Sequence, residues 1–201
     1  DAPSGLTQWY SIKTGFRMNI TEGETFFEEL AWTLDFDMWC ELGKAVGKLA
    51  EAFGMKVLVG ALPNRPVQEN RIPFNELLSQ VDFLTLHCPL SADTQNLIDA
   101  KAFDAMKPSA FLINCARGGI VNEQDLADAL IAGKIAGAAT DVLMVEPPKD
   151  GNVLLNSEIP NLLITPHSAW GSVDARQRIV QQMVENVEAF KKGKPIRQVN
   201  A

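Results

Sequence analysis

The feature that most constrains the fold is a regular alternation of short apolar runs and amphipathic segments, which begins at Glu41. In the first amphipathic segment, apolar side chains recur at helical spacing: Leu42, Ala45, Val46, Leu49 and Phe53. Gly54 supplies a C-cap, and the apolar run Met55 to Val59 follows as a short strand. Apolar strands that alternate with helices are typical of a parallel sheet covered by helices on both faces. The sequence therefore predicts an α/β fold with a doubly wound parallel sheet.

The same alternation continues to the end of the chain. It predicts helices over 74–79, 100–106, 123–132 and 173–191, and strands over 81–87, 110–115, 135–141 and 162–165. This order indicates a Rossmann-type domain, in which ligands bind at the carboxyl ends of the strands. No internal repeat or low-complexity tract interrupts the pattern.

Three short segments carry residues suited to proton transfer and carbonyl polarisation. They are Asn114 to Gly119, Asp141 to Pro147 and Thr165 to Trp170, and they contribute Arg117, Glu146 and His167. A guanidinium can polarise a carbonyl, an imidazolium can give up a proton, and a carboxylate can orient an imidazole. Each residue alone also fits a surface, loop or core role. The three segments together point to reduction of a keto acid, and each follows a predicted strand.

Several motifs occur in an ordered series: His87-Cys-Pro-Leu-Ser91 with Thr94, Asn114 to Gly119, Asp141, Glu146-Pro147 and Pro166-His167. With this series the chain resembles the D-isomer-specific 2-hydroxyacid dehydrogenases, especially the branch with glycerate dehydrogenase and hydroxypyruvate reductase. The resemblance runs from about Glu41 to the C-terminus. It implies reversible hydride transfer between NAD or NADP and a small 2-keto or 2-hydroxy acid.

The resemblance also implies residue roles. Arg117 would hold the carboxylate and carbonyl oxygen of the substrate, His167 would be the acid in reduction and the base in oxidation, and Glu146 would pair with His167. Asp141 would contact the nicotinamide carboxamide. The other residues expected at the cofactor are Gly43, His87, Cys88, Pro89, Thr94, Cys115 and Ala116.

The phosphate-binding turn departs from the family pattern. Counting back from Gly43 as the third glycine of Gly-x-Gly-x-x-Gly, the first two positions hold Met38 and Cys40. Their side chains would keep a pyrophosphate away from the helix N-terminus, and nearby carboxylates would repel it. In addition, residues 34–38 alternate apolar and acidic side chains, which favours a half-exposed strand over a buried central one.

The cofactor preference is expected to lean weakly toward tolerance of NADP. Ala61 occupies the position where an acidic residue would bond the ribose of NAD, and Arg65 nearby could meet a 2′-phosphate. The alternative is that Arg65 is a solvated loop residue.

The expected organisation is an atypical, loop-rich segment over 1–30, the Rossmann-type domain over 31–170, and a C-terminal helix and tail over 171–201. The last would be a remnant of a substrate-binding domain that is otherwise largely absent. Thr21-Glu-Gly-Glu24 could form a capping box for a short helix through Leu30. A degenerate gene, a truncated reading frame and deliberate engineering would each account for the unusual first 40 residues.

The last predicted helix carries an apolar stripe: Ile179, Val180, Met183, Val184, Val187 and Phe190. Without a substrate-binding domain, this stripe is expected to be partly exposed and to promote oligomerisation or poor solubility. Members of the family resemble one another in forming homodimers. The helix that usually forms the dimer in this family is not evident in this sequence. A homodimer is possible, but the sequence gives it no support.

Composition limits the partners. The net charge of -7 argues against nucleic acid, and no apolar run approaches the ~20 residues of a membrane span. The 3 cysteines form no close pair, which suits a reducing, cytoplasmic compartment, and the 2 histidines lack the spacing of a metal site. The competing hypothesis is a non-catalytic relic or interaction module of the family that has lost cofactor binding with its glycine turn.

Overall fold

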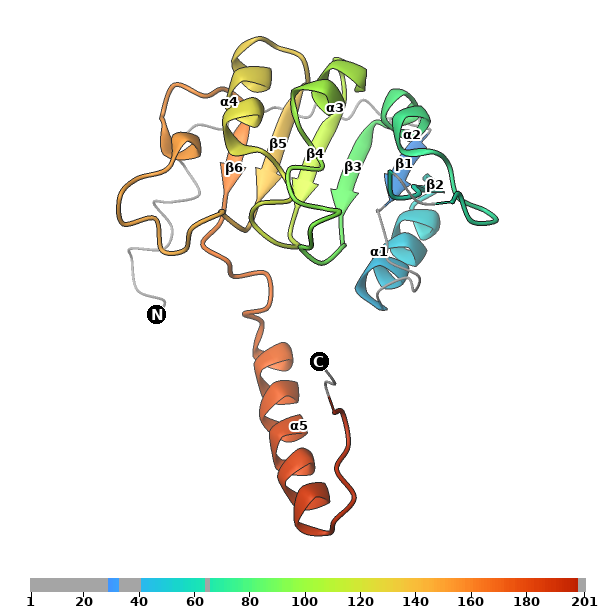
Figure 1. The fold of residues 1–201 in the computed structure, drawn as a ribbon, viewed down its shortest axis with the longest axis vertical. Coiled ribbons are helices and arrows are strands. Elements are labelled where there is room, and N and C mark those ends of the chain that lie inside the picture. Colours follow the sequence, from blue (N-terminus) through green and yellow to red (C-terminus); the bar gives the residue numbers. More distant parts are fainter. Residues whose placement is uncertain (1–28, 33–40, 64–65, 199–201) are drawn as a thin grey trace. The chain divides into compact units, whose positions relative to one another are not determined.

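A computed structural model describes residues 29–32, 41–63 and 66–198, and within them a parallel sheet is flanked by helices (Figure 1). The chain divides into two compact units, Asp1–Thr165 and Pro166–Ala201. The first unit contains, in chain order, β1 Glu29–Trp32, α1 Glu41–Ala52, β2 Lys56–Val59, α2 Phe74–Gln80, β3 Phe83–Leu86, α3 Ala100–Ala105, β4 Phe111–Asn114, α4 Glu123–Ile131, β5 Gly137–Thr140, the 3₁₀ helix η2 Val153–Leu155 and β6 Leu162–Ile164. The second unit contains α5 Val173–Lys191.

The sheet has the strand order β2-β1-β3-β4-β5-β6, and every pairing is parallel. Because β1 lies between β2 and β3, the chain winds outward from β1 in one direction and then from β3 in the other. Such a reversal is the topological switch point at which doubly wound folds bind ligands.

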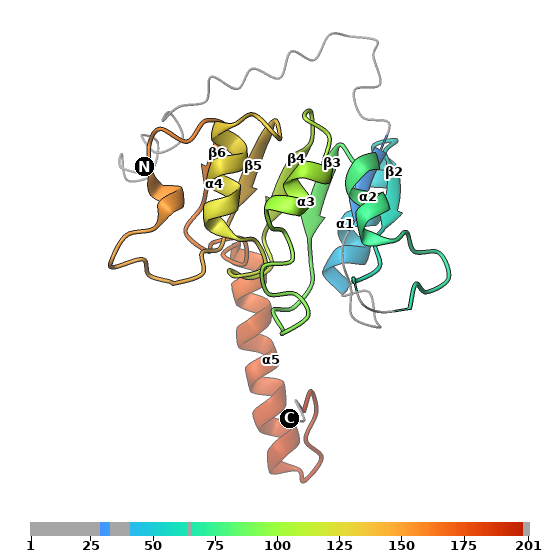
Figure 2. The same cartoon turned by 45° about the horizontal axis from the view of Figure 1, so that its top comes forward.

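The two faces of the sheet pack against different helices. Along β2, Val57 joins a small cluster around Ala50 of α1, whereas the next residue, Leu58, belongs to the main core. On β3, Phe83 packs on the cluster around Ala50, and the next residue, Leu84, belongs to the main core. This follows from the period-two alternation of side chains along a strand. Figure 2 shows α2, α3 and α4 side by side over the face of the main core.

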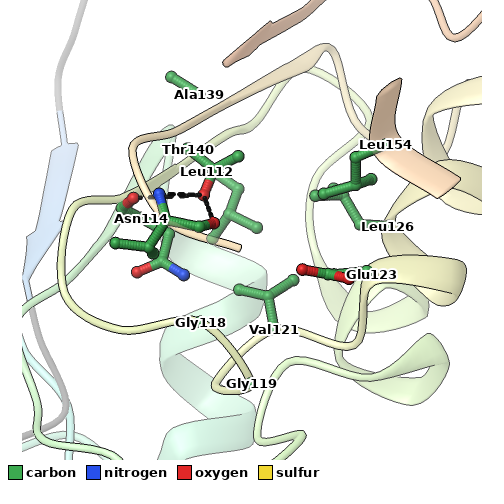
Figure 3. A pocket seen from close by; sticks show the side chains of 11 residues that line it. Leu112, Asn114, Gly118, Gly119, Val121, Glu123, Leu126, Ala139, Thr140 and Leu154 are labelled. Atoms are coloured by element: carbon green, nitrogen blue, oxygen red, sulfur yellow. Dashed lines mark hydrogen bonds between the residues drawn. The ribbon is translucent and has the colours of Figure 1, made fainter. Parts of the chain in front are cut away.

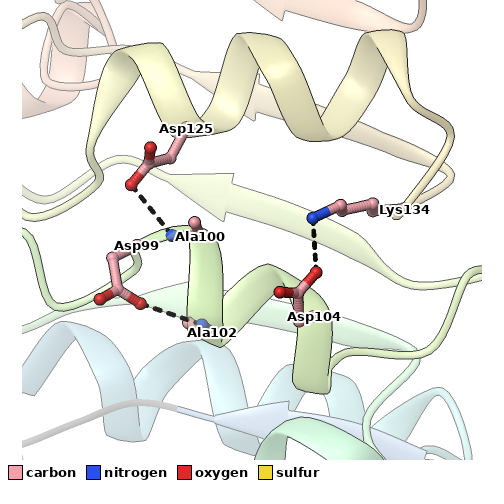
Figure 4. A network of polar contacts seen from close by, with 6 residues as sticks. All are labelled: Asp99, Ala100, Ala102, Asp104, Asp125 and Lys134. Atoms are coloured by element: carbon pink, nitrogen blue, oxygen red, sulfur yellow. Dashed lines mark hydrogen bonds and ion pairs between the residues drawn. The ribbon is translucent and has the colours of Figure 1, made fainter.

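Polar contacts tie α3 to α4 (Figure 4). Asp99 caps α3 with its side chain, and Asp125 of α4 accepts a hydrogen bond from the backbone N–H of Ala100 at 2.9 Å. At the other end of the pair, Lys134 contacts Asp104. Capping carboxylates satisfy N–H groups that have no partner within their own helix, so the ends of the two helices are fixed together.

The fold prediction is confirmed from Glu41 onward, where each expected helix and strand is present with bounds that differ by a few residues. The helix expected to run through Leu30 is wrong over Glu29 and Leu30, because these residues pair as strand β1 with both β2 and β3. The capping box at Thr21 and the alternation over 34–38 lie outside the described residues. The expected boundaries at 30 and 170 stay predictions.

The stripe on α5 is exposed: Ile179, Val180, Met183, Val184, Val187 and Phe190 all lie open to solvent. This confirms the expected exposure, whereas oligomerisation stays a prediction. Across the described part of the chain, no helix combines the length and apolar character needed to span a bilayer.

Candidate active site

Four neighbouring strands end in register at the carboxyl edge of the sheet. Their last residues pair across the sheet in one row: Leu86, Asn114, Thr140 and Ile164. The next residues along the chain are His87, Cys115, Asp141 and Thr165. The ladder continues here, because the N–H of Asp141 donates to the carbonyl of Asn114 at 2.9 Å. The arrowheads of β3, β4, β5 and β6 lie at one edge of the sheet (Figure 1), so the predicted site residues of three separate motifs follow the strands at this edge.

The loop after β3 is held by a buried threonine. The hydroxyl of Thr94 donates to the carbonyl of Pro89 at 2.7 Å and accepts from the N–H of Ser91 at 2.8 Å. Thr94 and Cys88 are buried, while Pro89 is exposed. Thr94 thus fixes the backbone of this loop, and the expected cofactor contacts of Cys88, Pro89 and Thr94 stay predictions.

His87 starts this loop and is half-buried. Its Nε2 lies 3.1 Å from the hydroxyl oxygen of Thr85. Burial disfavours the charged ring and lowers the pKa of His87 to about 4. A neutral imidazole at physiological pH suits the wall of a binding site and is unsuited to supply a proton.

The loop after β4 presents Arg117. Asn114 is buried and bonds this loop twice, with its Oδ1 accepting from the N–H of Ala116 at 3.0 Å and its Nδ2 donating to the carbonyl of Arg117 at 3.1 Å. The side chain of Arg117 is exposed, and its Nη1 donates to the carbonyl of Ala116 at 2.7 Å. The guanidinium therefore stands at the carboxyl edge on a backbone fixed by a buried amide.

Cys115 lies in the same loop and is exposed. Partial burial of its sulfur raises the pKa of the Cys115 thiol, and the nearby Asp141 carboxylate raises it further. Since the thiolate is the reactive form of cysteine, this environment favours an inert thiol.

The loop after β5 contains Asp141 and Glu146. Asp141 is buried, and its Oδ1 accepts from the hydroxyl of Thr165 at 2.5 Å. Glu146 is exposed, and its Oε1 accepts from the N–H of Leu143 at 2.7 Å. Both carboxylates are therefore oriented by groups of the chain itself.

The loops after β4 and β5 pack directly on each other at Gly118. A Cβ at this position would overlap the carbonyl of Leu143 and would lie 2.7 Å from the backbone nitrogen of Met144. Beneath the loops lies a cavity of about 10 Å³, with room for about one water molecule (Figure 3). Its lining includes Leu112, Asn114, Gly118, Val121, Glu123 and Thr140.

His167 belongs to the second unit of the chain. Its φ is 49°, a left-handed conformation that costs a residue with a Cβ about 1 to 2 kcal/mol. The side chain of His167 is exposed. The backbone carbonyl of His167 accepts a hydrogen bond from Nε1 of Trp170 at 2.8 Å. Backbone strain of this kind clusters at functional sites.

Of the remaining predicted cofactor residues, Gly43 is described by the structure and Arg65 is not. Gly43 is buried in the first turn of α1. Arg65 lies outside the described residues, as do Met38 and Cys40. Within the described ranges, no group of three or more His, Cys, Asp or Glu side chains could hold a metal ion.

The first unit thus brings the loops of Arg117, Asp141 and Glu146 together at one edge of the sheet. Their catalytic and cofactor roles, with that of His167, stay predictions. Sequence reasoning missed two residues with contacts to the loop after β5: Gly118, which packs on Leu143, and Glu123, whose carboxylate accepts from the N–H of Met144. The double glycine after Arg117 was the only signal for the first, and no local signal marks the second.

Comparisons with known proteins agree with this geometry. Residues 39–169 match the family model described as the NAD binding domain of D-isomer specific 2-hydroxyacid dehydrogenases. Over 160 residues the chain is 51% identical to a glycerate dehydrogenase of Methylorubrum extorquens, covering 80% of this chain and 50% of that protein. Over 163 residues it is 41% identical to a hydroxypyruvate reductase of Blautia hydrogenotrophica, covering 79% of this chain and 50% of that protein.

The fold matches a solved structure as well. A D-isomer specific 2-hydroxyacid dehydrogenase from Lactobacillus delbrueckii ssp. bulgaricus, in an NAD-complexed form, superposes with a TM-score of 0.71 at 32% identity. The match covers 85% of this chain and 56% of that one. The chain spans about half the length of the curated relatives it matches.

Proposed function

Because this chain belongs to the D-isomer-specific 2-hydroxyacid dehydrogenases, we propose that it acts in NAD(P)-dependent interconversion of a small 2-keto acid and its D-2-hydroxy acid. The single observation that carries the proposal is the row of strand ends. It sets the loops of Arg117, Asp141 and Glu146 at the carboxyl edge, where doubly wound folds bind nucleotides.

The described residues fit a nicotinamide cofactor at this edge. The loops that would hold it contain Pro89, Cys115, Ala116 and Asp141, and the polar contacts within these loops fix their backbones. Bound there, the cofactor supplies or accepts the hydride. The hydroxyl of Thr165 orients the carboxylate of Asp141, which would accept a hydrogen bond from an amide group.

Arg117 would bind the substrate. Its guanidinium is exposed and permanently charged, and its planar fork matches a carboxylate. The same group can polarise the adjacent carbonyl, where negative charge develops during reduction. The bonds from Asn114 keep the backbone of Arg117 in place as this charge forms.

Glu146 and His167 would move the proton. The Leu143 N–H orients the carboxylate of Glu146, which would in turn fix the ring of His167. In reduction, the imidazolium of His167 would protonate the carbonyl oxygen, and in oxidation the neutral ring would take the proton back. Acid catalysis of this type contributes about 10² to 10⁴ in rate.

The finer assignments belong to the same proposal. Hydroxypyruvate or glyoxylate is the first substrate to test, since the relative from Methylorubrum extorquens is a glycerate dehydrogenase. Either NAD or NADP could serve, with a weak lean toward tolerance of NADP that rests on Arg65. We place the protein in the cytoplasm, as its odd number of cysteines suggests, and a homodimer stays open.

The deciding experiment is a pair of measurements on the purified chain. Nucleotide fluorescence is titrated with NADH and with NADPH, and reduction of hydroxypyruvate is then followed at saturating cofactor. We expect micromolar binding, with turnover that falls at least about 100-fold in Arg117→Ala and His167→Ala. Arg178→Ala, which removes an exposed cation from α5, is the matched control and should turn over normally.

Two results would overturn the proposal. Turnover that persists in Arg117→Ala would show that the site is wrongly assigned. Absence of nucleotide binding at millimolar concentration would favour the competing hypothesis, a non-catalytic relic or interaction module of the family.

A further inference from the structure

Glu123 begins α4 and uses both oxygens of its half-buried carboxylate on one distant loop. Its Oε1 accepts from the N–H of Met144 at 2.6 Å, and its Oε2 accepts from Nδ2 of Asn152 at 2.7 Å. Hydrogen bonds to an ionised acceptor are roughly twice as strong as neutral ones. Glu123 therefore ties both ends of the segment 144–152 to the first turn of α4.

The peptide between Leu143 and Met144 is fixed by two contacts. Its N–H donates to Glu123, and its carbonyl packs so closely on Gly118 that no Cβ would fit there. Gly118 directly follows Arg117 in the chain. The position of this one peptide thus couples the loop of Arg117 to α4.

The adjoining peptide, between Val142 and Leu143, orients Glu146. The N–H of Leu143 donates to Oε1 of Glu146 at 2.7 Å. A shift of residues 143 and 144 would therefore move the group that orients the Glu146 carboxylate. Such a shift would at the same time release the packing beside Arg117.

We propose that Glu123 is a positioning residue, which acts through the backbone of Leu143 and Met144 to hold Glu146 and Arg117 in one arrangement. This inference rests on the proposed function for its catalytic consequence. The two N–H donors meet different oxygens of Glu123, and a carboxylate has two acceptor oxygens whereas a side-chain amide has one. Its place in the first turn of α4 also favours negative charge through the helix dipole.

The first test is amide hydrogen exchange of the full chain, measured by NMR at Leu143 and Met144. In Glu123→Ala we expect both amides to exchange about tenfold faster or more, which is the change for loss of roughly one hydrogen bond. Asp125→Ala is the matched control. It removes a carboxylate from the same helix turn, but that carboxylate accepts from the N–H of Ala100 and not from Met144. That control should accelerate Ala100 and leave Leu143 unchanged.

The second test is a comparison of kcat and KM. We expect Glu123→Ala to lower kcat about tenfold or more while the KM for NADH stays within about twofold, because Ala116 keeps its bond to Asn114 and Asp141 keeps its bond to Thr165. Glu123→Gln, which can still satisfy one of the two donors, should give an intermediate kcat. Asp125→Ala should keep the kcat of the unaltered chain. The change in its melting temperature gives the loss of stability that follows when a carboxylate is removed from this helix end.

The outcomes separate the inference from the proposed function. Leu143 exchange that stays within twofold in Glu123→Ala overturns the positioning role, and so does an equal loss of kcat in Asp125→Ala. If the unaltered chain shows no turnover, the proposed function fails. The exchange rates at Leu143 then still decide whether Glu123 holds the loop of Glu146.

Discussion

At the scale of single residues, Gly118 is the tightest point between the loops of Arg117 and Glu146. Gly118→Ala would place a methyl group on the carbonyl of Leu143 and near the nitrogen of Met144. Because both neighbours are backbone, the loops must move apart. We expect a loss of about 1 to 3 kcal/mol in the free energy of unfolding, with a fall in turnover, measured by urea denaturation and steady-state kinetics.

Gly133→Ala is the control for this substitution. Gly133 has φ 68°, and a Cβ there would meet nothing within 4 Å. It should cost only the strain of a left-handed alanine, about 1 kcal/mol, and should leave turnover unchanged. Equal turnover in the Gly118 and Gly133 variants would contradict the close packing at Gly118.

His87 predicts a pH dependence of stability. Burial lowers its folded-state pKa to about 4, below the 6.5 of the unfolded chain, so the unfolded state binds more protons between these two values. Above pH 6.5 the ring is neutral in both states and the free energy of unfolding is highest. As the pH falls toward 4, protonation of the ring in the unfolded state lowers the free energy of unfolding. We expect a loss of about 2 kcal/mol after allowance for partial exposure of the ring.

The measurement is the urea midpoint from pH 7 down to pH 4, compared with His87→Asn. The variant lacks the titrating ring, so its midpoint should fall less over this interval. Parallel curves for the two proteins would show that His87 does not carry the effect.

Residue types in motifs could be predicted from the sequence, whereas their supporting contacts could not. Arg117, Glu146 and His167 are predicted because they stand in the ordered motifs of the family resemblance, and each motif follows a predicted strand. The bonds of Glu123 reach residues 21 and 29 positions away, and no local pattern encodes such partners. The structure was also needed to show that Thr94 is used within its own loop.

At the scale of elements, periodicity predicted the helices and strands that follow Glu41, since each carries apolar side chains at a regular spacing. The strand β1 was missed because its four residues carry no distinctive pattern. Its identity comes from pairing with β2 and β3 on its two sides, which is a tertiary effect. The 3₁₀ helix η2 was missed because a single turn is too short for periodicity to show.

The N-cap of α4 gives a prediction at this scale. The side chain of Asn122 accepts from the N–H groups of Gln124 and Asp125, both at 3.1 Å. Asn122→Ala should cost about 1 kcal/mol and lower the melting temperature by about 2 to 4 °C, because α4 packs on the core. Differential scanning calorimetry measures the shift.

Ser172→Ala supplies the comparison, since Ser172 caps α5 through one bond to the N–H of Ala175 at 3.2 Å. No residue of α5 is buried, so this variant should leave the main transition unchanged while reducing helicity slightly. An equal shift in both variants would argue against a special contribution of α4 to the core.

At the scale of the whole molecule, the buried cores lie in the first unit. The residues of both clusters fall between Val46 and Ile164, and the second unit begins at Pro166. The catalytic histidine of the proposed function is on the other side of that division. Folding stability should therefore depend mainly on the first unit, whereas turnover should require residues of both units.

Truncation after Thr165 tests this separation. The shortened chain keeps both cores and the bond from Thr165 to Asp141, so we expect its melting temperature to stay within about 4 °C and its binding of NADH to persist. Turnover should vanish, because His167 is removed.

Truncation after Gly151 is the control. It also deletes β6 and the core residues Leu154 and Ile159, and it should abolish cooperative unfolding. A fall of about 10 °C or more on truncation after Thr165 would mean that the second unit contributes to the stability of the first.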